Sequence, residues 1–69
     1  MEFKSFTYDL KGNTYYIFAI KRDNMWEYWL NDKDYGVMLL MYATNDYNLE
    51  MLEINLEDYV EIYKDYLKE

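Results

Sequence analysis

The C-terminal third of the chain, residues 45–69, reads NDYNLEMLEINLEDYVEIYKDYLKE. Its apolar residues recur at steps of three and four, a spacing that keeps them on one side of an α-helix. They are Leu49, Leu52, Leu56, Tyr59, Val60, Tyr63, Tyr66 and Leu67. The spacing predicts an amphipathic helix that packs its apolar side against the rest of the chain.

A second series in the same segment is acidic, and its members also stand three or four residues apart. They are Asp46, Glu50, Glu53, Glu57, Glu61, Asp65 and Glu69. On a helix this spacing predicts a continuous negative ridge beside the apolar side, at a cost of roughly 0.2–0.5 kcal/mol per like-charged pair. The ridge has two interpretations: a solvated face that keeps a tyrosine-rich protein in solution, or a surface that contacts a partner.

The start of this helix is open to two interpretations. The unbroken spacing favours a helix from about Tyr47. Alternation over residues 50–56 also fits a strand that leads into a helix capped by Asn55, because Asn is a favoured N-cap residue. Residues after Asn55 are helical in both interpretations.

The first 44 residues show the period-two alternation of β-strands, interrupted by turn signals. Strands are predicted over residues 2–10, 14–22, 25–30 and 37–44. The segments between them are Lys11-Gly12-Asn13, Asp23-Asn24 and the polar residues 31–36. Connections this short join neighbouring antiparallel strands. The predicted fold is therefore a single α+β domain over residues 1–69: a four-stranded antiparallel β-meander with a C-terminal α-helix packed on one face.

One helix covers only one face of such a sheet, and both sides of the second strand are apolar. With Trp26, Tyr28 and Leu30 toward the helix, Trp29 points away from it. We place Tyr15 and Ile17 beside Trp29 on the uncovered face. An exposed apolar patch of this kind marks an interaction site. Tyr15, Ile17 and Trp29 are therefore predicted to form a dimer or partner interface.

Composition excludes several classes of function. The 69 residues include 14 acidic and 7 basic ones, a formal charge of −7. We therefore expect repulsion from nucleic acids and anionic membranes, and attraction to a basic protein. Without cysteine or histidine, the chain lacks the usual zinc ligands and the Ser-His and Cys-His catalytic pairs. We predict no catalytic activity, no metal and no cofactor.

Location is inferred from two further features. Residues 1–10 do not have a positive start followed by an apolar run, the pattern of a secretory signal. The longest apolar run, Val37–Ala43, is too short to span a bilayer. We therefore expect a cytoplasmic protein with no membrane partner.

Two functional hypotheses follow. The first is a non-catalytic acidic protein-binding module, of the class of inhibitors encoded by phages and mobile elements, that occupies a basic or nucleic-acid-binding surface of its target. Carboxylates four residues apart on a helix are separated by about 6 Å along the axis, a spacing of the same order as that of nucleic-acid phosphates. The contact is assigned to Glu50, Glu53, Glu57, Glu61 and Asp65. The second hypothesis is a small homodimeric structural or regulatory subunit, with Tyr15, Ile17 and Trp29 in the interface.

Overall fold

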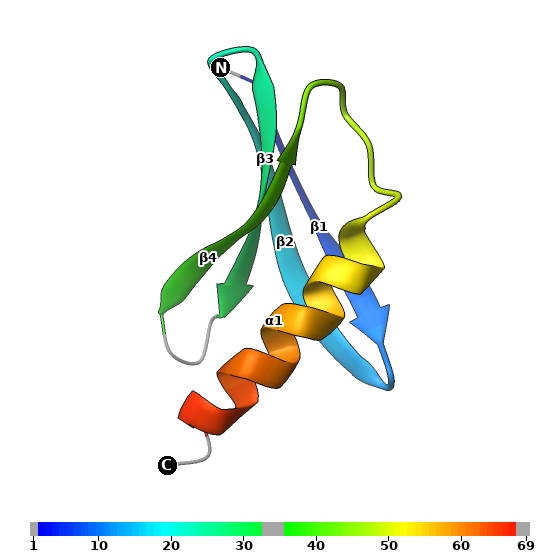
Figure 1. Cartoon of the computed structure of the whole chain (residues 1–69), viewed down its shortest axis with the longest axis vertical. Coiled ribbons are helices and arrows are strands. Elements are labelled where there is room, and N and C mark those ends of the chain that lie inside the picture. The colour runs from blue at the N-terminus through cyan, green and yellow to red at the C-terminus, as the bar shows by residue number, and fades with distance from the viewer. Residues whose placement is uncertain (1, 33–35, 68–69) are drawn as a thin grey trace.

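The computed structural model describes residues 2–32 and 36–67, and the side chains of these residues except 32, 37 and 64–67. Its elements are β1 (Phe3–Leu10), β2 (Asn13–Arg22), β3 (Met25–Asp32), β4 (Val37–Thr44) and α1 (Leu52–Leu67). The strands form one antiparallel sheet in the order β1-β2-β3-β4, and α1 lies diagonally across one face of it (Figure 1). The predicted α+β fold is confirmed.

Two tight turns set the register of the first three strands. Lys11 and Gly12 have φ angles of 50° and 84°, and Asp23 and Asn24 have φ angles of 53° and 63°. Positive φ at both central residues is typical of type I′ turns, whose twist matches that of the flanking strands. Directly opposed residues of antiparallel strands point to the same face. The turns therefore decide which side chains lie together.

The core lies between α1 and the face of the sheet that it covers. Ile17 is opposite both Phe6 and Leu30, and Leu30 is opposite Leu39, so one apolar row crosses all four strands. The helix contributes two fully buried leucines to this layer. The buried residues are Leu10, Ile17, Ala19, Trp26, Tyr28, Leu30, Met41, Leu52 and Leu56.

A bulge in β4 adjusts this packing. Tyr28 is opposite Tyr42 and Trp29 is opposite Leu40, so Met41 is an extra residue in the strand. Met41 is nevertheless buried, and Tyr42 packs against the core with its ring stacked on Tyr28 at 4.3 Å between centroids. The bulge thus lets two successive residues of β4 contribute to the core, and it increases the local twist of the strand.

The helix begins later than predicted. α1 starts at Leu52, not near Tyr47, and residues 50–56 do not form a strand. Asn55 lies inside the helix, where its backbone N–H donates to the carbonyl oxygen of Met51 at 3.1 Å. Both interpretations of the helix start were therefore wrong in their boundary. Leu49, which the spacing assigned to the apolar side, is exposed in the linker that precedes α1.

A chain of hydrogen bonds explains why residues 45–48 stay outside the helix. The Asn48 N–H donates to the hydroxyl of buried Tyr28 at 2.8 Å, and this hydroxyl lies 2.9 Å from Thr44 Oγ1. Thr44 Oγ1 in turn donates to the carbonyl oxygen of Asp46 at 2.6 Å. With its single proton used in that bond, Thr44 accepts the proton of Tyr28. Backbone groups of the linker are thus satisfied by the sheet rather than by a helical turn.

Candidate interaction surfaces

Charge is divided unequally between the two layers of the molecule. Residues 45–63 contain six acidic and no basic residues, a charge of −6, whereas residues 2–32 contain five acidic and four basic residues, a charge of −1. The first segment forms the linker and most of α1. We call its acidic side chains the acidic layer: Asp46, Glu50, Glu53, Glu57, Asp58 and Glu61.

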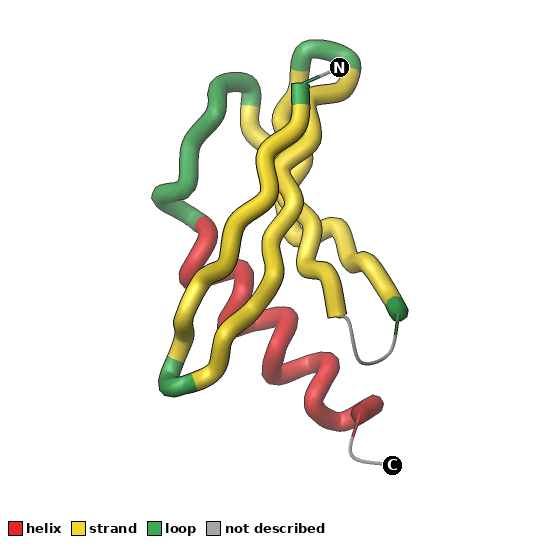
Figure 2. The backbone as a smooth tube through the Cα atoms, turned by 180° about the vertical axis from the view of Figure 1, so that it is seen from behind, coloured by secondary structure: helices red, strands yellow, loops and turns green. Residues whose placement is uncertain are grey.

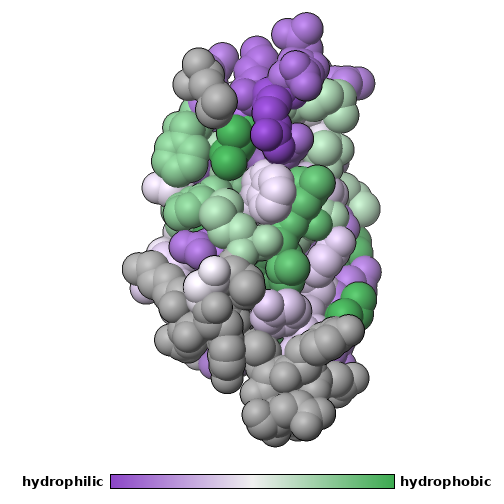
Figure 3. All heavy atoms as spheres, turned by 90° about the vertical axis from the view of Figure 1, so that its left-hand side faces the viewer, coloured by the Kyte–Doolittle hydropathy of each residue, from purple (hydrophilic) through white to green (hydrophobic). Residues whose placement is uncertain are grey.

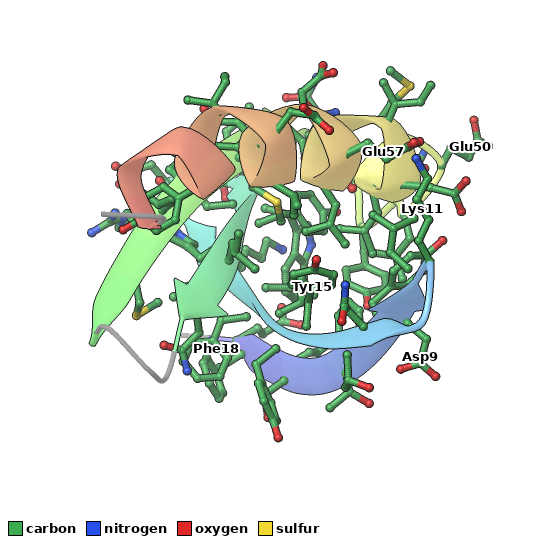
Figure 4. The ribbon with its side chains drawn as sticks, turned by 90° about the horizontal axis from the view of Figure 1, so that it is seen from below. Asp9, Lys11, Tyr15, Phe18, Glu50 and Glu57 are labelled. Atoms are coloured by element: carbon green, nitrogen blue, oxygen red, sulfur yellow. The ribbon has the colours of Figure 1, made fainter. Side chains whose placement is uncertain are left out.

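Two residues of the predicted ridge are bonded to the sheet layer. Glu53 Oε1 accepts a hydrogen bond from the Tyr8 hydroxyl at 2.7 Å, and this bond is the main cause that raises the pKa of Tyr8. Glu57 Oε2 lies 3.3 Å from Lys11 Nζ, and Figure 4 shows this pair at the end of the sheet where β1 turns into β2. Both carboxylates thus connect α1 to the sheet layer while remaining at the surface.

The other predicted ridge residues differ in their placement. Glu50 is exposed in the turn before α1, where its backbone N–H donates to Asn48 Oδ1 at 2.7 Å. Glu61 is exposed on α1, as is Asp58. Asp65 belongs to α1, but its side chain lies outside the described residues. Steps of four residues turn about 40° around a helix, so the acids wind from the β1 side of α1 toward its outer side.

The second surface is the face of the sheet that α1 does not cover. Figure 2 shows the strands from this side, with α1 behind them and no described element in front. Trp29 lies between Phe18 and Leu40 on neighbouring strands, and the Phe18 ring packs 5.4 Å from that of Phe3. We call this surface the open face, and its large apolar residues are Phe3, Tyr16, Phe18, Ile20, Met25, Trp29, Met38 and Leu40.

Several open-face residues are strongly exposed. Phe3 retains 55% of its accessible surface, and Met38 and Leu40 each retain 41%. Seen from the side on which β4 lies, apolar residues occupy the middle of the molecule (Figure 3). A hollow also opens on this face, with a lining of Ser5, Phe6, Thr7, Tyr16, Phe18 and Asn31. The open face is therefore both apolar and uneven.

The structure places Trp29 on the open face, as predicted, but Tyr15 and Ile17 lie on the covered face, so their predicted placement was wrong. Ile17 is fully buried under α1, and Tyr15 packs against the core (Figure 4). The reason is the register: Ile17 is opposite Leu30, so it faces the helix whenever Leu30 does. The residue that joins Trp29 on the open face is Phe18, which sequence reasoning missed. The two-residue turn at Asp23-Asn24 was the signal for it, because it pairs Phe18 with Trp29.

Two carboxylates of the open face, Asp9 and Glu27, have hydrogen-bond donors within the chain. Glu27 Oε1 accepts hydrogen bonds from Arg22 Nη2 at 2.9 Å and from Trp29 Nε1 at 3.2 Å. The bond from Arg22 is the main cause that lowers the pKa of Glu27. At the other end, Thr14 Oγ1 donates to Asp9 Oδ1 at 2.7 Å. Both carboxylates are thus held by neighbouring donors.

Metal-binding groups do not gather in the part of the chain that is described. Among the side chains that the structure describes, no three acidic ones approach closely enough to hold a metal ion together. The named lining residues of the hollow include neither a carboxylate nor an amine. Among the described helical residues, no segment is long and apolar enough to cross a membrane.

Known proteins do not assign a family to this chain. No protein-family model, no curated protein and no solved structure matches it. Its function therefore has to be inferred from the acidic layer and the open face.

Proposed function

We propose that this chain is a non-catalytic protein-binding module that docks its acidic layer on a basic surface of another protein. The observation that carries the proposal is the segregation of charge, −6 over residues 45–63 against −1 over residues 2–32. A one-signed surface attracts and orients a partner of opposite charge, and it raises the association rate. Basic surfaces that could match the acidic layer are typical of nucleic-acid-binding proteins. We therefore favour an inhibitor that occupies the nucleic-acid-binding surface of its target.

Three exposed acids of the acidic layer make the main contacts in this proposal. Glu50 precedes α1, while Asp58 and Glu61 lie on the helix, and all three are exposed. Glu53 and Glu57 add to the negative potential while they stay bonded to Tyr8 and Lys11. Asp65 extends the series along the sequence. We place this binding in the cytoplasm, and the cysteine-free composition agrees with that compartment.

The test uses two triple variants with the same change in charge. One carries Glu50→Gln, Asp58→Asn and Glu61→Gln in the acidic layer, and the matched control carries Glu2→Gln, Asp9→Asn and Asp23→Asn in the sheet layer. Immobilised wild-type protein and both variants are incubated with a cell extract, and the bound proteins are identified by mass spectrometry. We expect the wild type and the control to retain the same basic nucleic-acid-binding protein, and the acidic-layer variant to lose it.

Salt gives a second readout. Binding through exposed charges weakens strongly when salt is raised to about 0.5 M, because the Debye length then falls to a few ångströms. Equal retention of the partner by both triple variants, or binding that is unchanged by salt, contradicts the proposal. Circular dichroism shows whether each variant keeps the fold, which we expect because all six acids are exposed.

A further inference from the structure

The open face carries enough area for a specific interface. Four strands about 4.8 Å apart, with eight residues of about 3.3 Å each, give a face of roughly 19 by 26 Å, or roughly 500 Å² in projection. Relief from the side chains adds to this figure. Specific interfaces begin at about 600 Å² of accessible surface per partner, about an eighth of the 4985 Å² of this molecule. The area suits a small, reversible interface.

The charges of the open face allow it to meet a copy of itself. Its described strand residues include the acids Asp9 and Glu27 and the base Arg22, of which the last two form an ion pair at 2.9 Å. The acidic layer lies on the other side of the sheet. In two stacked sheets with their helices outside, the helix layers are about 30 Å apart, well beyond a Debye length of about 8 Å. Copies of this acidic protein can therefore approach through the open face without strong repulsion.

Two polar groups of the open face have hydrogen-bond partners within the chain, so desolvation would not leave these two groups unsatisfied. The indole N–H of Trp29 donates to Glu27, and the Thr14 hydroxyl donates to Asp9. Burial of an unsatisfied polar group costs about 1–3 kcal/mol. Since these bonds lie within one chain, an apolar surface can cover the Trp29 indole and the Thr14 hydroxyl without that cost.

From these observations we propose that the open face is the interface of a homodimer in which two sheets stack face to face and both helices lie outside. A second copy supplies what the face requires, a nearly neutral apolar surface of the same size. A basic partner would meet little opposite charge here. The inference stands apart from the proposed function, because it concerns the other side of the sheet. Trp29, Phe18 and Leu40 form the centre of this interface.

The experiment measures oligomeric state by sedimentation equilibrium between about 1 and 100 μM, the range that spans micromolar dissociation constants. We expect the wild type to change from the monomer mass of 8.6 kDa toward twice that mass as its concentration rises. Leu40→Glu and Phe3→Glu each place a negative charge in the proposed interface. There the charge meets either the same charge of the second copy or apolar residues. Each should raise the dissociation constant at least tenfold. A wild type that remains monomeric over the whole range overturns the proposal.

Ile54→Glu is the matched control, because Ile54 is an apolar residue of α1 with 55% of its surface exposed, the same fraction as Phe3. It should change the dissociation constant less than twofold. If Ile54→Glu dissociates the dimer and the other two variants do not, α1 forms the interface and the proposal is wrong. If Leu40→Glu acts but Phe3→Glu does not, pairing occurs through the β4 edge, and face-to-face stacking is also excluded. Phe3 lies near the start of edge strand β1, so its variant keeps the test valid if Leu40→Glu fails to fold.

Discussion

The two faces of the sheet are similar in composition and opposite in environment. The covered face presents Ile17 and Tyr28 to α1, and both are fully buried. The open face presents Phe18 and Trp29 from the same two strands, directly opposite each other, and it leaves Leu40 beside them 41% exposed. Apolar character therefore does not decide which side of this sheet becomes the core. The decision comes from the side on which the linker lays α1.

The covered face and the open face are expected to serve different purposes, the first in stabilising the fold and the second in association. Leucines of α1 and the residues beneath them stabilise the fold, because their burial removes apolar surface from water. Residues of the open face keep part of their apolar surface in water, as Leu40 does with 41% exposed, so we expect them to stabilise one chain less and to leave apolar surface for association. The same substitution should therefore lower the free energy of unfolding more on the covered face than on the open face.

The largest expected effect is that of Leu56→Ala. Leu56 has no exposed surface, and the loss of a buried leucine side chain costs about 2–5 kcal/mol through lost transfer free energy and the cavity left behind. For a domain of this size, with a free energy of unfolding of about 3–10 kcal/mol, that loss removes much of the stability. Urea unfolding monitored by circular dichroism measures it.

Leu40→Ala is the matched substitution on the open face. At a concentration low enough to keep the chain monomeric, it should lower the free energy of unfolding by less than about 1 kcal/mol. Similar losses for Leu40→Ala and Leu56→Ala would show that the open face supports the fold of the single chain, and the contrast between the faces would then be wrong.

Tyr28→Phe should have the next largest effect. It removes the hydroxyl that accepts the Asn48 N–H at 2.8 Å and bonds to Thr44 Oγ1. An N–H group left without its partner in a partly buried site costs about 1–3 kcal/mol. Hydrogen exchange should also show faster exchange of the Asn48 amide. Tyr42→Phe, which removes a single longer bond of 3.2 Å to the Asn48 carbonyl oxygen, should cost less, and a larger loss there would contradict this account of the linker.

Alkaline pH should also weaken the covered side. Burial, with smaller contributions from Tyr28 and Tyr47, raises the pKa of Tyr42 from 10.0 to about 12. Because the folded pKa is above the unfolded one, the stabilisation is fully present below pH 10.0 and is lost as pH rises toward about 12. As pH rises across this range, the thermal midpoint should fall more steeply for the wild type than for Tyr42→Phe. Equal slopes would show that Tyr42 ionises as easily in the folded chain as in the unfolded one.

The smallest expected effect comes from the pair Lys11–Glu57. Its atoms lie 3.3 Å apart, but the lysine side chain is 78% exposed, and exposed ion pairs contribute about 0–1 kcal/mol. Lys11→Met should therefore leave the thermal midpoint almost unchanged in high salt and lower it slightly in low salt. A loss well above this range would mean that Glu57 acts mainly as a link between α1 and the sheet rather than as part of the acidic layer.

Much of the fold follows from local sequence patterns. Alternation in residues 2–44 and the turn signals at Gly12 and Asn24 predicted four strands in the order that the structure shows. Spacing of three and four placed Leu52 and Leu56 on the buried side of α1. These features were predictable because strand and helix periods and positive φ angles are properties of neighbouring residues.

The residue at which α1 begins, and the bonding of its acidic side chains to the sheet, depend on partners far away in the sequence. The helix cannot begin near Tyr47, because Asn48 is bonded to Tyr28, twenty positions earlier. Glu53 is bonded to Tyr8, 45 positions away. Such pairs form only after the strands and the helix have packed, so no local pattern indicates them.

The sequence by itself determined the strands, the positions of the turns and the presence of an amphipathic helix, since each follows from short-range sterics and periodicity. Tertiary structure alone decided which of two apolar faces is covered. Both sides of β2 are hydrophobic enough to be a core, so the choice depends on where the linker, anchored to the Tyr28 hydroxyl, directs α1. That choice buries Ile17, exposes the face around Trp29, and places the acids of α1 on the opposite side of the sheet.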